Sequence, residues 1–431
     1  MDGSNLSPPL DPRLEGLKPS ATVAINEHCA ALRRAGREVY SLGLGQSPFP
    51  IPERVVDGLR SHAAQKSYQP VRGLQALREV VAAYHARTQR IDASPEGVLV
   101  GPGSKELLFL LQIAFAGDIL LPSPAWVSYA PQARLVGRRV VPLPTTCADG
   151  WKVTAAQLDT VCVTVPARAR LLVLNSPNNP TGLAYDAPEL AALAEVARRH
   201  GVLVLSDEIY GELRFDAPHC SIATFYPEGT IISGGLSKWC GAGGWRLGTF
   251  QFPRELRWLL DAMAVIASET YTAVSAPVQF AAVRAFEDVP EMSHYLATAR
   301  WILAALMRAC HARLAEAGAV LCEPQGGFYL FPDFAPLRPG LDRAGLGRAE
   351  IMCRRLLEDT GVAILPGSDF GRPDDELTAR LALVDFDGAR AMAAADMPGA
   401  RDDANAFVER HCAPVITAVD RLAAWTRTYA A

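Results

Sequence analysis

Short, wholly apolar runs alternate with helical stretches between about residues 54 and 300. The apolar runs cover residues 98–100, 119–121, 171–174, 202–205 and 231–232. They lack the alternation of a half-exposed strand, which is typical of strands buried on both faces of a parallel sheet. Helices that connect such strands cover both faces of the sheet. The pattern therefore predicts an α/β fold with a mostly parallel, doubly wound sheet.

Residues 171–205 form one strand–helix–strand unit, in which a loop follows the strand 171–174. Asp186 is a good N-cap with Glu189 three residues later, and Pro188 falls in the first helical turn, where a proline is tolerated. Gly201 ends the helix that we expect over residues 190–200, because glycine readily adopts the conformation that follows a helix. The next strand begins at Val202.

The pattern changes near residue 300. Helices are expected over 301–317, 349–358 and 404–426, and strands over 328–331 and 362–365. These elements predict a smaller α+β domain. We divide the chain into an N-terminal arm with part of the small domain (1–53), a large α/β domain (54–300) and the C-terminal small domain (301–431). The first twenty residues, with four prolines, are expected to form an extended arm, and residues 388–403 a surface insertion.

The composition excludes several classes of protein. The 431 residues include 42 Lys+Arg and 46 Asp+Glu, a formal net charge of −4 at pH 7. No block of Lys or Arg offers a footprint for nucleic acid or an anionic membrane. The nine cysteines are scattered without a C-x-x-C pair, which is typical of reduced thiols. No signal peptide or membrane-spanning run is recognisable, so a cytoplasmic enzyme is expected.

Polar residues of complementary chemistry follow several of the predicted strands. Asn179 lies in the run S-P-N-N-P-T-G at 176–182, Asp207 and Tyr210 lie in D-E-I-Y at 207–210, and Ser237-Lys238 follow the strand at 231–232. Each group alone has an ordinary structural explanation, such as a loop ligand or a surface charge. Because ligands bind at the carboxyl ends of parallel strands, we expect these groups to converge on one site.

The combined chemistry matches the needs of pyridoxal 5′-phosphate. A lysine such as Lys238 forms a Schiff base with an aldehyde, and a buried aspartate such as Asp207 holds a protonated pyridine nitrogen. A tyrosine and an asparagine can both hydrogen-bond one phenolic oxygen. Phosphate is bound by helix N-termini and by arginine, which the turn at 103–105 and Arg246 provide.

These motifs are similar to those of the class I/II pyridoxal-phosphate aminotransferases of the aspartate aminotransferase type, fold type I. The resemblance extends from about residue 42 to residue 386 and also includes S-K…G-W-R-L-G at 237–248. The spacings match as well: 28 residues from Asn179 to Asp207, 31 from Asp207 to Lys238 and 8 from Lys238 to Arg246. The resemblance implies a ping-pong transfer of an amino group between an L-amino acid and a 2-oxo acid.

The resemblance also implies a role for each site residue. The catalytic residues are Lys238, Asp207 and Tyr210, and the substrate is bound by Gly45, Trp126, Asn179 and Arg380, of which Arg380 grips the carboxylate. No metal is implied. Tyr68 reaches the phosphate in a neighbouring subunit, so a homodimer with shared active sites is implied. The implied ligands of the cofactor are Gly103, Ser104, Lys105, Trp126, Asn179, Asp207, Tyr210, Ser237, Lys238, Arg246 and Tyr68.

Other activities remain open at this point. A carbon–sulfur β-lyase and an enzyme similar to aminocyclopropane-carboxylate synthase share every motif, and a non-catalytic sensor could keep the same fold. The segment 268–277 contains no arginine, so a preference for dicarboxylic substrates is not supported. The expected side-chain pocket is apolar or aromatic, formed by Phe49, Tyr271, Thr272 and Phe328.

Overall fold

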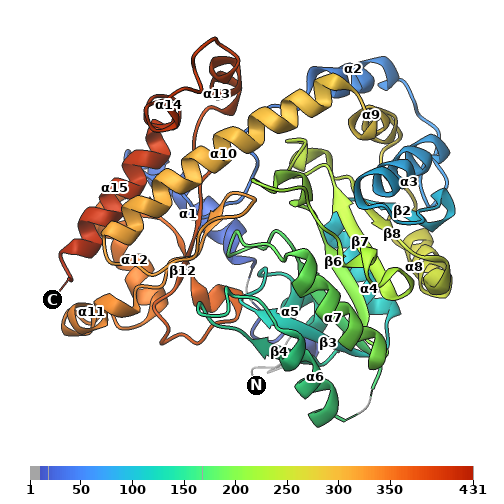
Figure 1. Ribbon diagram of the computed structural model, residues 1–431, viewed down its shortest axis with the longest axis horizontal. Coiled ribbons are helices and arrows are strands. Elements are labelled where there is room, and N and C mark those ends of the chain that lie inside the picture. Colours follow the sequence, from blue (N-terminus) through green and yellow to red (C-terminus); the bar gives the residue numbers. More distant parts are fainter. Residues whose placement is uncertain (1–9, 18, 167, 431) are drawn as a thin grey trace, which may run out of the picture.

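A seven-stranded sheet forms the centre of the computed structural model, which describes residues 10–17, 19–166 and 168–430 (Figure 1). The strand order is β2-β8-β7-β6-β5-β3-β4, and all pairs are parallel except those of β8 with β2 and β7. The predicted doubly wound, mostly parallel sheet is therefore confirmed. The strands are β2 (Val98–Gly101), β3 (Asp118–Ser123), β4 (Val140–Pro144), β5 (Arg170–Asn175), β6 (Leu203–Asp207), β7 (Thr230–Gly235) and β8 (Gly248–Gln251).

Most residues of the central strands are apolar, as expected where helices cover both faces of a sheet. Along β5, Leu171 and Val173 pack with α4 (Ser104–Ala114), α5 (Tyr129–Leu135) and α8 (Arg257–Glu269). Leu172 and Leu174 pack on the other face with α6 (Ala155–Thr164) and α7 (Ala187–Arg199). All five predicted strands are present. The apolar pattern missed β4, which is half-exposed at the edge, and β8, which carries the buried polar residues Thr249 and Gln251.

Helix α7 begins as its sequence predicts. The Glu189 N–H donates to the Asp186 carboxylate at 2.9 Å, and the Asp186 N–H donates to the Glu189 carboxylate at 2.8 Å. This reciprocal capping box satisfies two N–H groups that have no partner within the helix. The loop between β5 and α7 is therefore held at both ends, and it carries Asn179.

Helix α10 (Pro290–Glu316) runs diagonally across the molecule, from α2 (Glu53–His62) and α9 (Ala276–Phe286) to the C-terminal elements (Figure 1). It begins eleven residues before the expected start at 301, with Pro290 in its first turn. The proposed domain boundary at residue 300 lies within this helix, and the division into domains stays a prediction. Helix α3 (Gln75–Gln89) packs against α9 beside the sheet.

The C-terminal elements surround a small sheet of β9 (Tyr329–Leu330), β11 (Leu365–Pro366) and β12 (Ala379–Ala382). The N-terminal segment joins them, because β1 (Tyr40–Ser41) pairs with β10 (Val362–Ala363) and α1 (Ala21–Arg34) contacts β11. Figure 1 accordingly shows the blue α1 among orange elements. The surrounding helices are α11 (Arg338–Arg343), α12 (Ala349–Thr360), α13 (Gly388–Ala395), α14 (Ala404–His411) and α15 (Ala413–Arg427).

Three expectations for this region were wrong in detail. The single helix expected over 404–426 is two helices, because Pro414 starts a new helix, α15, after the turn at Cys412 and cannot continue the preceding one. The strand expected over 362–365 divides into β10 and β11. The expected surface insertion contains α13, whose Ala391 and Ala395 are buried. Of the expected N-terminal arm, residues 1–9 and 18 lie outside the described residues, and Pro12–Leu14 form a short 3-10 helix.

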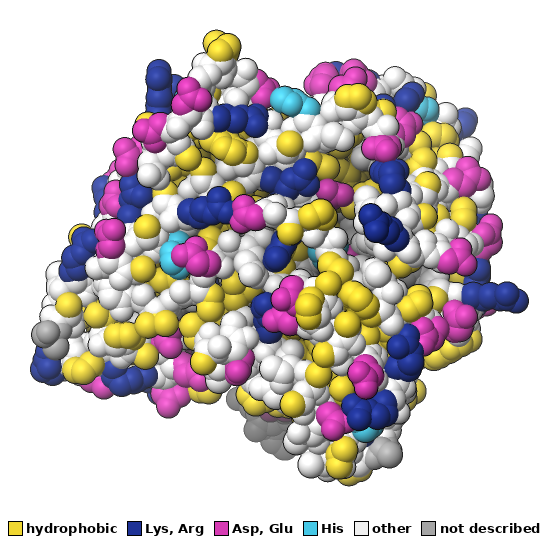
Figure 2. Space-filling view, viewed as in Figure 1, with side chains coloured by type: hydrophobic (Ala, Val, Ile, Leu, Met, Phe, Trp, Pro, Cys, Tyr) yellow, Lys and Arg dark blue, Asp and Glu magenta, His cyan; other side chains and the backbone are white. Residues whose placement is uncertain are grey.

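Charged side chains of both signs are interspersed over the face seen in Figure 2. This agrees with the absence of a Lys or Arg block in the sequence. Within the described ranges, no helix combines the length and the apolar character needed to cross a bilayer.

Candidate active site

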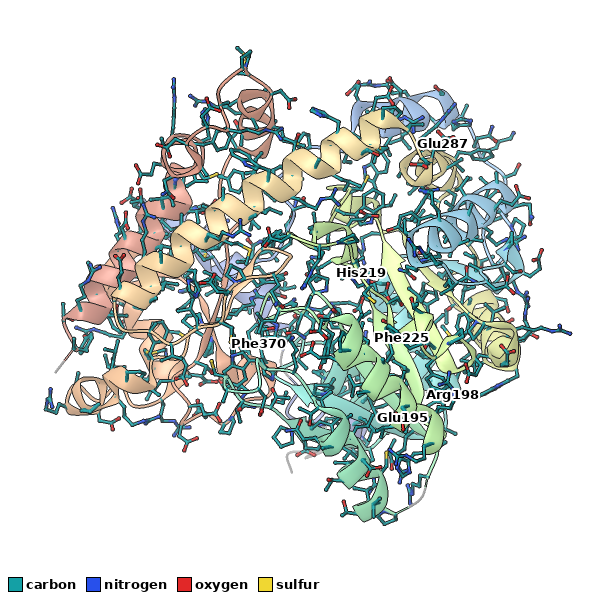
Figure 3. All side chains as sticks on the ribbon, viewed as in Figure 1. Glu195, Arg198, His219, Phe225, Glu287 and Phe370 are labelled. Carbon is teal, nitrogen blue, oxygen red and sulfur yellow. The ribbon has the colours of Figure 1, made fainter. Side chains whose placement is uncertain are left out.

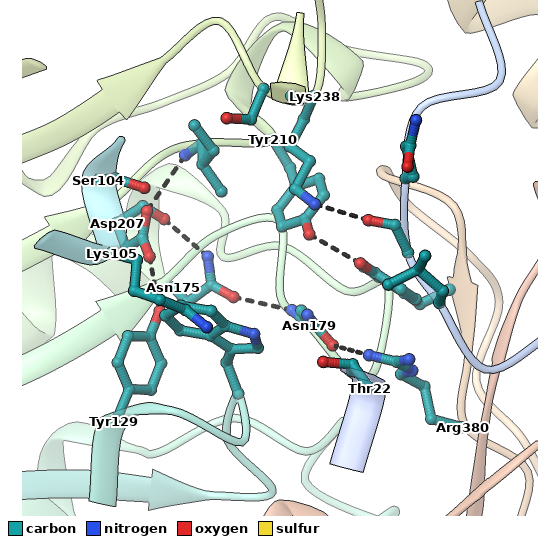
Figure 4. A pocket seen from close by; sticks show the side chains of 18 of the residues that line it. Thr22, Ser104, Lys105, Tyr129, Asn175, Asn179, Asp207, Tyr210, Lys238 and Arg380 are labelled. Carbon is teal, nitrogen blue, oxygen red and sulfur yellow. Dashed lines mark hydrogen bonds between the residues drawn. The ribbon is translucent and has the colours of Figure 1, made fainter. Parts of the chain in front are cut away.

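The carboxyl ends of β5, β6 and β7 border a cavity of about 450 Å³ (Figure 4). Helix α4 points its N-terminus at this cavity, and α1 and the C-terminal elements supply the other walls. The expected convergence of distant motifs is therefore present in the fold. The predicted site residues that line the cavity are Gly45, Ser104, Lys105, Trp126, Asn179, Asp207, Tyr210, Ser237, Lys238, Arg246 and Arg380.

Lys238 lies in the turn after β7, and its Nζ donates to the carbonyl oxygen of Gly45 at 2.6 Å. The rings of Tyr210 and Phe328 lie 5.7 and 5.9 Å from Nζ. Burial, followed by the positive charges of Arg380 and Arg246, lowers the pKa of Lys238 to about 8. At physiological pH a much larger fraction of this amine is therefore neutral, and so nucleophilic, than of an exposed lysine.

Asp207 ends β6 and is held by donors on both carboxylate oxygens. The Tyr129 hydroxyl donates to Oδ2 at 2.6 Å, and the Ser233 hydroxyl and the Ile209 N–H donate to Oδ1 at 3.3 and 3.4 Å. Burial raises the pKa of Asp207, while the hydrogen bond from Tyr129 opposes the rise. The carboxylate is thus fixed in orientation, and it is kept ionisable by hydrogen bonds rather than by water.

A chain of amide contacts links Asp207 to Arg380 (Figure 4). The Asn175 side chain donates to the Asp207 carbonyl oxygen at 2.8 Å and accepts from the Asn179 N–H at 2.8 Å. Arg380 Nη1 then donates to Asn179 Oδ1 at 3.2 Å. The loop after β5 therefore sets the distance between the acidic group and the arginine at opposite ends of the cavity.

Arg380 is fully buried (0% exposed) on β12, with its guanidinium between the rings of Tyr329 and Phe370 at 4.8 and 4.9 Å. Its Nη2 donates to the carbonyl oxygen of Gly43. Its Nε has no hydrogen-bond partner among the described residues, and no described carboxylate forms a salt bridge with it. A planar guanidinium with an unsatisfied donor is suited to bind a carboxylate.

The other end of the cavity is a crowded turn around Gly103. Gly103 has a φ of +87°, and a Cβ there would lie 2.0 Å from Nη2 of Arg246. A Cβ at Gly248 would lie 2.2 Å from the backbone nitrogen of Ser104, the first residue of α4. Only glycine therefore lets Arg246 and the α4 N-terminus approach each other, where free N–H groups and positive charge attract an anion.

The family of class I and II aminotransferases matches residues 37–383 of this sequence. The chain belongs to this family. Aspartate aminotransferase of Geobacillus stearothermophilus is 35% identical over 373 residues, which cover 84% of this chain and 92% of that protein. Aspartate/prephenate aminotransferase of Thermus thermophilus is 34% identical over 366 residues, covering 84% and 91%.

Solved structures agree with the sequence comparison. Aspartate aminotransferase from Thermus thermophilus with maleate has a TM-score of 0.81 at 30% identity, over 98% of this chain and 100% of that chain. The match confirms the predicted fold type I. This protein is therefore an aminotransferase, an enzyme that transfers an amino group.

Two of the predicted site residues of the aminotransferase are not among those that line the cavity. Gly103 lies directly behind Arg246, as described above. Tyr68 lies between α2 and α3 and is 90% exposed. Its contact with a neighbouring subunit stays a prediction.

The expected side-chain pocket is wrong. Phe328 is fully buried and packs edge-on against Tyr210, Phe49 packs against Phe386, and the Tyr271 hydroxyl donates to the Val100 carbonyl oxygen at 3.2 Å. None of these residues, nor Thr272, lines the cavity. Adjacent strand residues point to opposite faces, and it is Tyr329, the neighbour of Phe328, that faces the site.

Sequence reasoning missed several residues of the aminotransferase site. Tyr329 donates to or accepts from the Tyr210 hydroxyl at 2.8 Å, and its hydroxyl oxygen lies 1.9 Å from where a Cβ at Gly45 would stand. Tyr129, which holds Asp207, follows Trp126 by three residues in the same loop–helix segment. Thr22 and Val23 reach the cavity from the start of α1. The run Phe328-Tyr329 carried a usable signal, whereas no motif marks α1.

Proposed function

We propose that this aminotransferase binds pyridoxal 5′-phosphate in the cavity and exchanges the amino group between an L-amino acid and a 2-oxo acid. The excess of positive charge among the side chains that line the cavity supports this proposal. Four cationic side chains, those of Lys105, Lys238, Arg246 and Arg380, face one acidic side chain, Asp207, and none of the four forms a salt bridge with a described residue. A phosphate of nearly two negative charges and a substrate carboxylate would balance them.

The phosphate group fits the end of the cavity around Gly103. Arg246, the Ser237 hydroxyl and the backbone N–H groups of Ser104 and Lys105 are the donors that would hold it, as the resemblance implied. The helix dipole of α4 adds partial positive charge at the same place. Gly103 contributes by its lack of a side chain, since a Cβ would collide with Arg246.

Trp126 and the end of β6 would flank the pyridine ring. When bound, this cofactor supplies an aldehyde that takes up the amino group and a ring that withdraws electrons from the substrate Cα. Asp207, oriented by Tyr129, would hold the ring nitrogen. Tyr210 and Asn179 would bond the phenolic oxygen, with Tyr329 orienting the Tyr210 hydroxyl at 2.8 Å.

Lys238 would act first as the amine that binds the cofactor and then as the group that moves the proton. Because the pKa of Lys238 is lowered to about 8, its Nζ can accept a proton from the substrate Cα and return it within one reaction cycle. Besides burial, the groups that lower its pKa are Arg380 and Arg246, which would bind the two anions. Anion binding would therefore raise the basicity of Nζ when the proton has to be removed.

Arg380 and Asn179 would hold the carboxylate that every amino acid and 2-oxo acid carries. The Arg380 side chain is clamped between Tyr329 and Phe370, so its donors are oriented before the substrate arrives. This orientation places the substrate Cα at a fixed distance from Nζ of Lys238 and reduces the entropic cost of reaction. A Cβ at position 45 would collide with the Tyr329 hydroxyl, so a glycine there allows Tyr329 to pack against Arg380.

The chemistry of the substrate side chain points to Lys105. Its Nζ lies 5.1 Å from the centre of the Trp126 ring, inside the cavity. We propose that this ammonium binds the second carboxylate of a dicarboxylic substrate. Two of the related proteins are named for aspartate, which is such a substrate. Two features of the sequence did not support this preference: Ser104 stands where related members that favour acidic substrates often carry a lysine, and segment 268–277 contains no arginine.

A homodimer completes the proposal. Tyr68 is 90% exposed in one chain, so its side chain is free to reach a second copy. Its hydroxyl would bind the phosphate in the neighbouring subunit, so each site would need both chains. Sedimentation of the Tyr68→Phe protein should still give a dimer, with weaker cofactor binding.

The spectrum of the purified protein tests the proposal. The protein should be yellow, and an L-amino acid alone should bleach the band as the amino group moves to the cofactor. A 2-oxo acid should then restore the colour, and initial rates at several fixed concentrations of the second substrate should give parallel double-reciprocal lines. Aspartate, glutamate and phenylalanine, screened one by one, identify the donor.

Two further results would distinguish the alternatives. Lys238→Ala should not complete a full cycle of amino transfer, and an undiminished rate would refute the assignment of Lys238 as a catalytic residue. A lyase would keep its colour while releasing ammonia and a 2-oxo acid from one amino acid alone, and that result would overturn the proposal of amino transfer. A sensor would bind the cofactor but complete neither half-reaction.

A further inference from the structure

Two cysteines that are far apart in the sequence meet at the apolar cluster that contains Phe370. Cys147 follows β4 of the central sheet, and Cys322 lies between α10 and β9. Their Sγ atoms are 3.6 Å apart, although 175 residues separate them in the chain. Both are partly exposed free thiols. Of the other seven cysteines, all in the described part of the chain, only Cys220 is also partly exposed, and the rest are buried.

The contact between the two sulfurs makes one of them reactive. While Cys322 is protonated, its thiol donates to the carbonyl oxygen of Cys147 at 3.6 Å. When Cys322 is ionised, a hydrogen bond from the Cys147 thiol, helped by the positive charge of Lys152, stabilises the thiolate and lowers the pKa of Cys322 to about 7. The same pairing raises the pKa of Cys147. Cys322 is therefore the more acidic of the two thiols, and it has a second thiol within reach to complete a disulfide.

The pair packs against a cluster that reaches the substrate end of the active site. The buried members of this cluster include Phe331 and Phe370, and Cys147 and Cys322 pack against it together with Ala21 at the start of α1. Phe370 lies between the C-terminal elements and the central sheet (Figure 3), and its ring stacks on Arg380. A covalent bond at the pair would therefore constrain the side chain that clamps Arg380, because packed interiors transmit small shifts.

We propose that Cys147 and Cys322 form a modification site for a low-molecular-weight disulfide such as glutathione disulfide, and that the resulting internal disulfide weakens substrate binding at Arg380. The Cys322 thiolate attacks one sulfur of the oxidant, forming a mixed disulfide and releasing one glutathione thiolate. Cys147 loses its proton and attacks Cys322, and the second glutathione leaves. The two cysteines lose two electrons, and glutathione disulfide is reduced to two glutathione molecules.

The geometry makes an internal disulfide the expected product. A disulfide requires sulfurs about 2.0 Å apart, and two thiols already in contact need only small side-chain rotations to approach. The bond would join the loop after β4 to the segment before β9, on either side of the Phe370 cluster. It would also close a very long loop in the unfolded chain, which stabilises the folded state.

Peptide mapping tests the first part of the proposal. The full-length protein with its bound cofactor is incubated with glutathione disulfide, alkylated and digested with trypsin. Cys147, Cys322 and Cys220 fall in separate tryptic peptides, 140–152, 314–343 and 215–238. We expect peptide 140–152 joined to 314–343, while peptide 215–238 is alkylated or carries glutathione. Two separate glutathione adducts at Cys147 and Cys322, or two alkylated thiols, would overturn the proposal.

Kinetics and thermal unfolding test the second part. After dialysis, the oxidised protein should show a higher KM for the amino acid and a higher Tm than the reduced protein, and dithiothreitol should reverse both changes. Cys322→Ser should respond to neither reagent. Cys147→Ser should stop at a glutathione adduct on Cys322, without the rise in Tm that the internal disulfide gives, whereas Cys220→Ser should respond like the unmodified sequence. A joined peptide with an unchanged KM would refute the coupling to Arg380.

Discussion

Replacing Arg380 with alanine removes the group that we assign to the substrate carboxylate. In the structure the guanidinium donates to Asn179 and Gly43, keeps Nε unsatisfied and lies between two aromatic rings. A bound carboxylate would accept two parallel charge-assisted hydrogen bonds from it. Every amino acid and 2-oxo acid would lose these bonds in the variant, so both half-reactions should suffer.

The size of the effect follows from those two bonds. Hydrogen bonds to charged groups contribute about 1.5–3 kcal/mol each, so the loss of two costs about 3–6 kcal/mol. At about 1.4 kcal/mol for each factor of ten, kcat/KM should fall by about 10²- to 10⁴-fold. Most of the fall should appear in KM, because the carboxylate is held in the bound substrate as well as in the transition state. Arg380→Lys keeps the positive charge but loses the planar pair of N–H donors, so we expect an intermediate loss of kcat/KM.

The assay measures each half-reaction from the cofactor absorbance, with an amino acid and with the amine that lacks only its carboxylate. The unmodified enzyme should prefer the amino acid strongly, and Arg380→Ala should lose this preference while its slow rate with the amine stays the same. Arg170→Ala is a matched control, because Arg170 is also buried and donates only to the carbonyl oxygens of Cys162 and Val165. If the amino acid and the amine lose rate by the same factor, Arg380 does not bind the carboxylate.

Three further predictions follow from the cofactor end of the site. The pKa of Lys238 is lowered to about 8, so its amine is mostly protonated below that pH. The rate at which the cofactor-free protein takes up pyridoxal 5′-phosphate should therefore rise with pH through a midpoint near 8. A midpoint at the usual pKa of lysine, measured by stopped-flow absorbance, would contradict this prediction. Tyr129→Phe removes the 2.6 Å hydrogen bond to Asp207. In equilibrium dialysis, this variant should bind the cofactor about tenfold more weakly, the equivalent of one such bond. The control Tyr185→Phe loses a hydrogen bond from the Val153 N–H and should bind the cofactor normally. Gly103→Ala and Gly137→Ala both place a side chain at a positive φ, but of the two only the Cβ at 103 would collide with another group, Arg246. Both variants should therefore have a lower Tm. Only Gly103→Ala should also lose cofactor affinity in equilibrium dialysis.

The residues that the sequence could predict lie directly after buried strands. Asp207 ends β6 and Lys238 follows β7, and a parallel arrangement of those strands is enough to bring both to one edge of the sheet. The capping box of Asp186 and Glu189 is equally local, since its two hydrogen bonds depend on a spacing of three residues. Local rules therefore predict these contacts without knowledge of the rest of the fold.

Other contacts depend on how separate segments pack. Gly45 and Tyr329 are far apart in the sequence, yet the hydroxyl of Tyr329 occupies the space that a side chain at 45 would need. Hydrophobicity alone could not decide whether Phe328 or Tyr329 faces the cavity, because both faces of β9 are buried. The same limit applies to Thr22, which reaches the cavity only because α1 joins the C-terminal elements.

Net charge illustrates why composition could not locate the site. The value of −4 sums pairs that cancel on the surface, such as Arg198 with Glu228, together with groups that do not cancel. Arg380 is buried without a salt bridge to a described residue, and its Nε is unsatisfied. The charge of the Asp369 carboxylate compensates Arg380 in part, and a buried charge that is not fully compensated destabilises a protein. A substrate carboxylate would provide that compensation, so binding of an unreactive carboxylate analogue should raise Tm in the unmodified protein and leave that of Arg380→Ala unchanged.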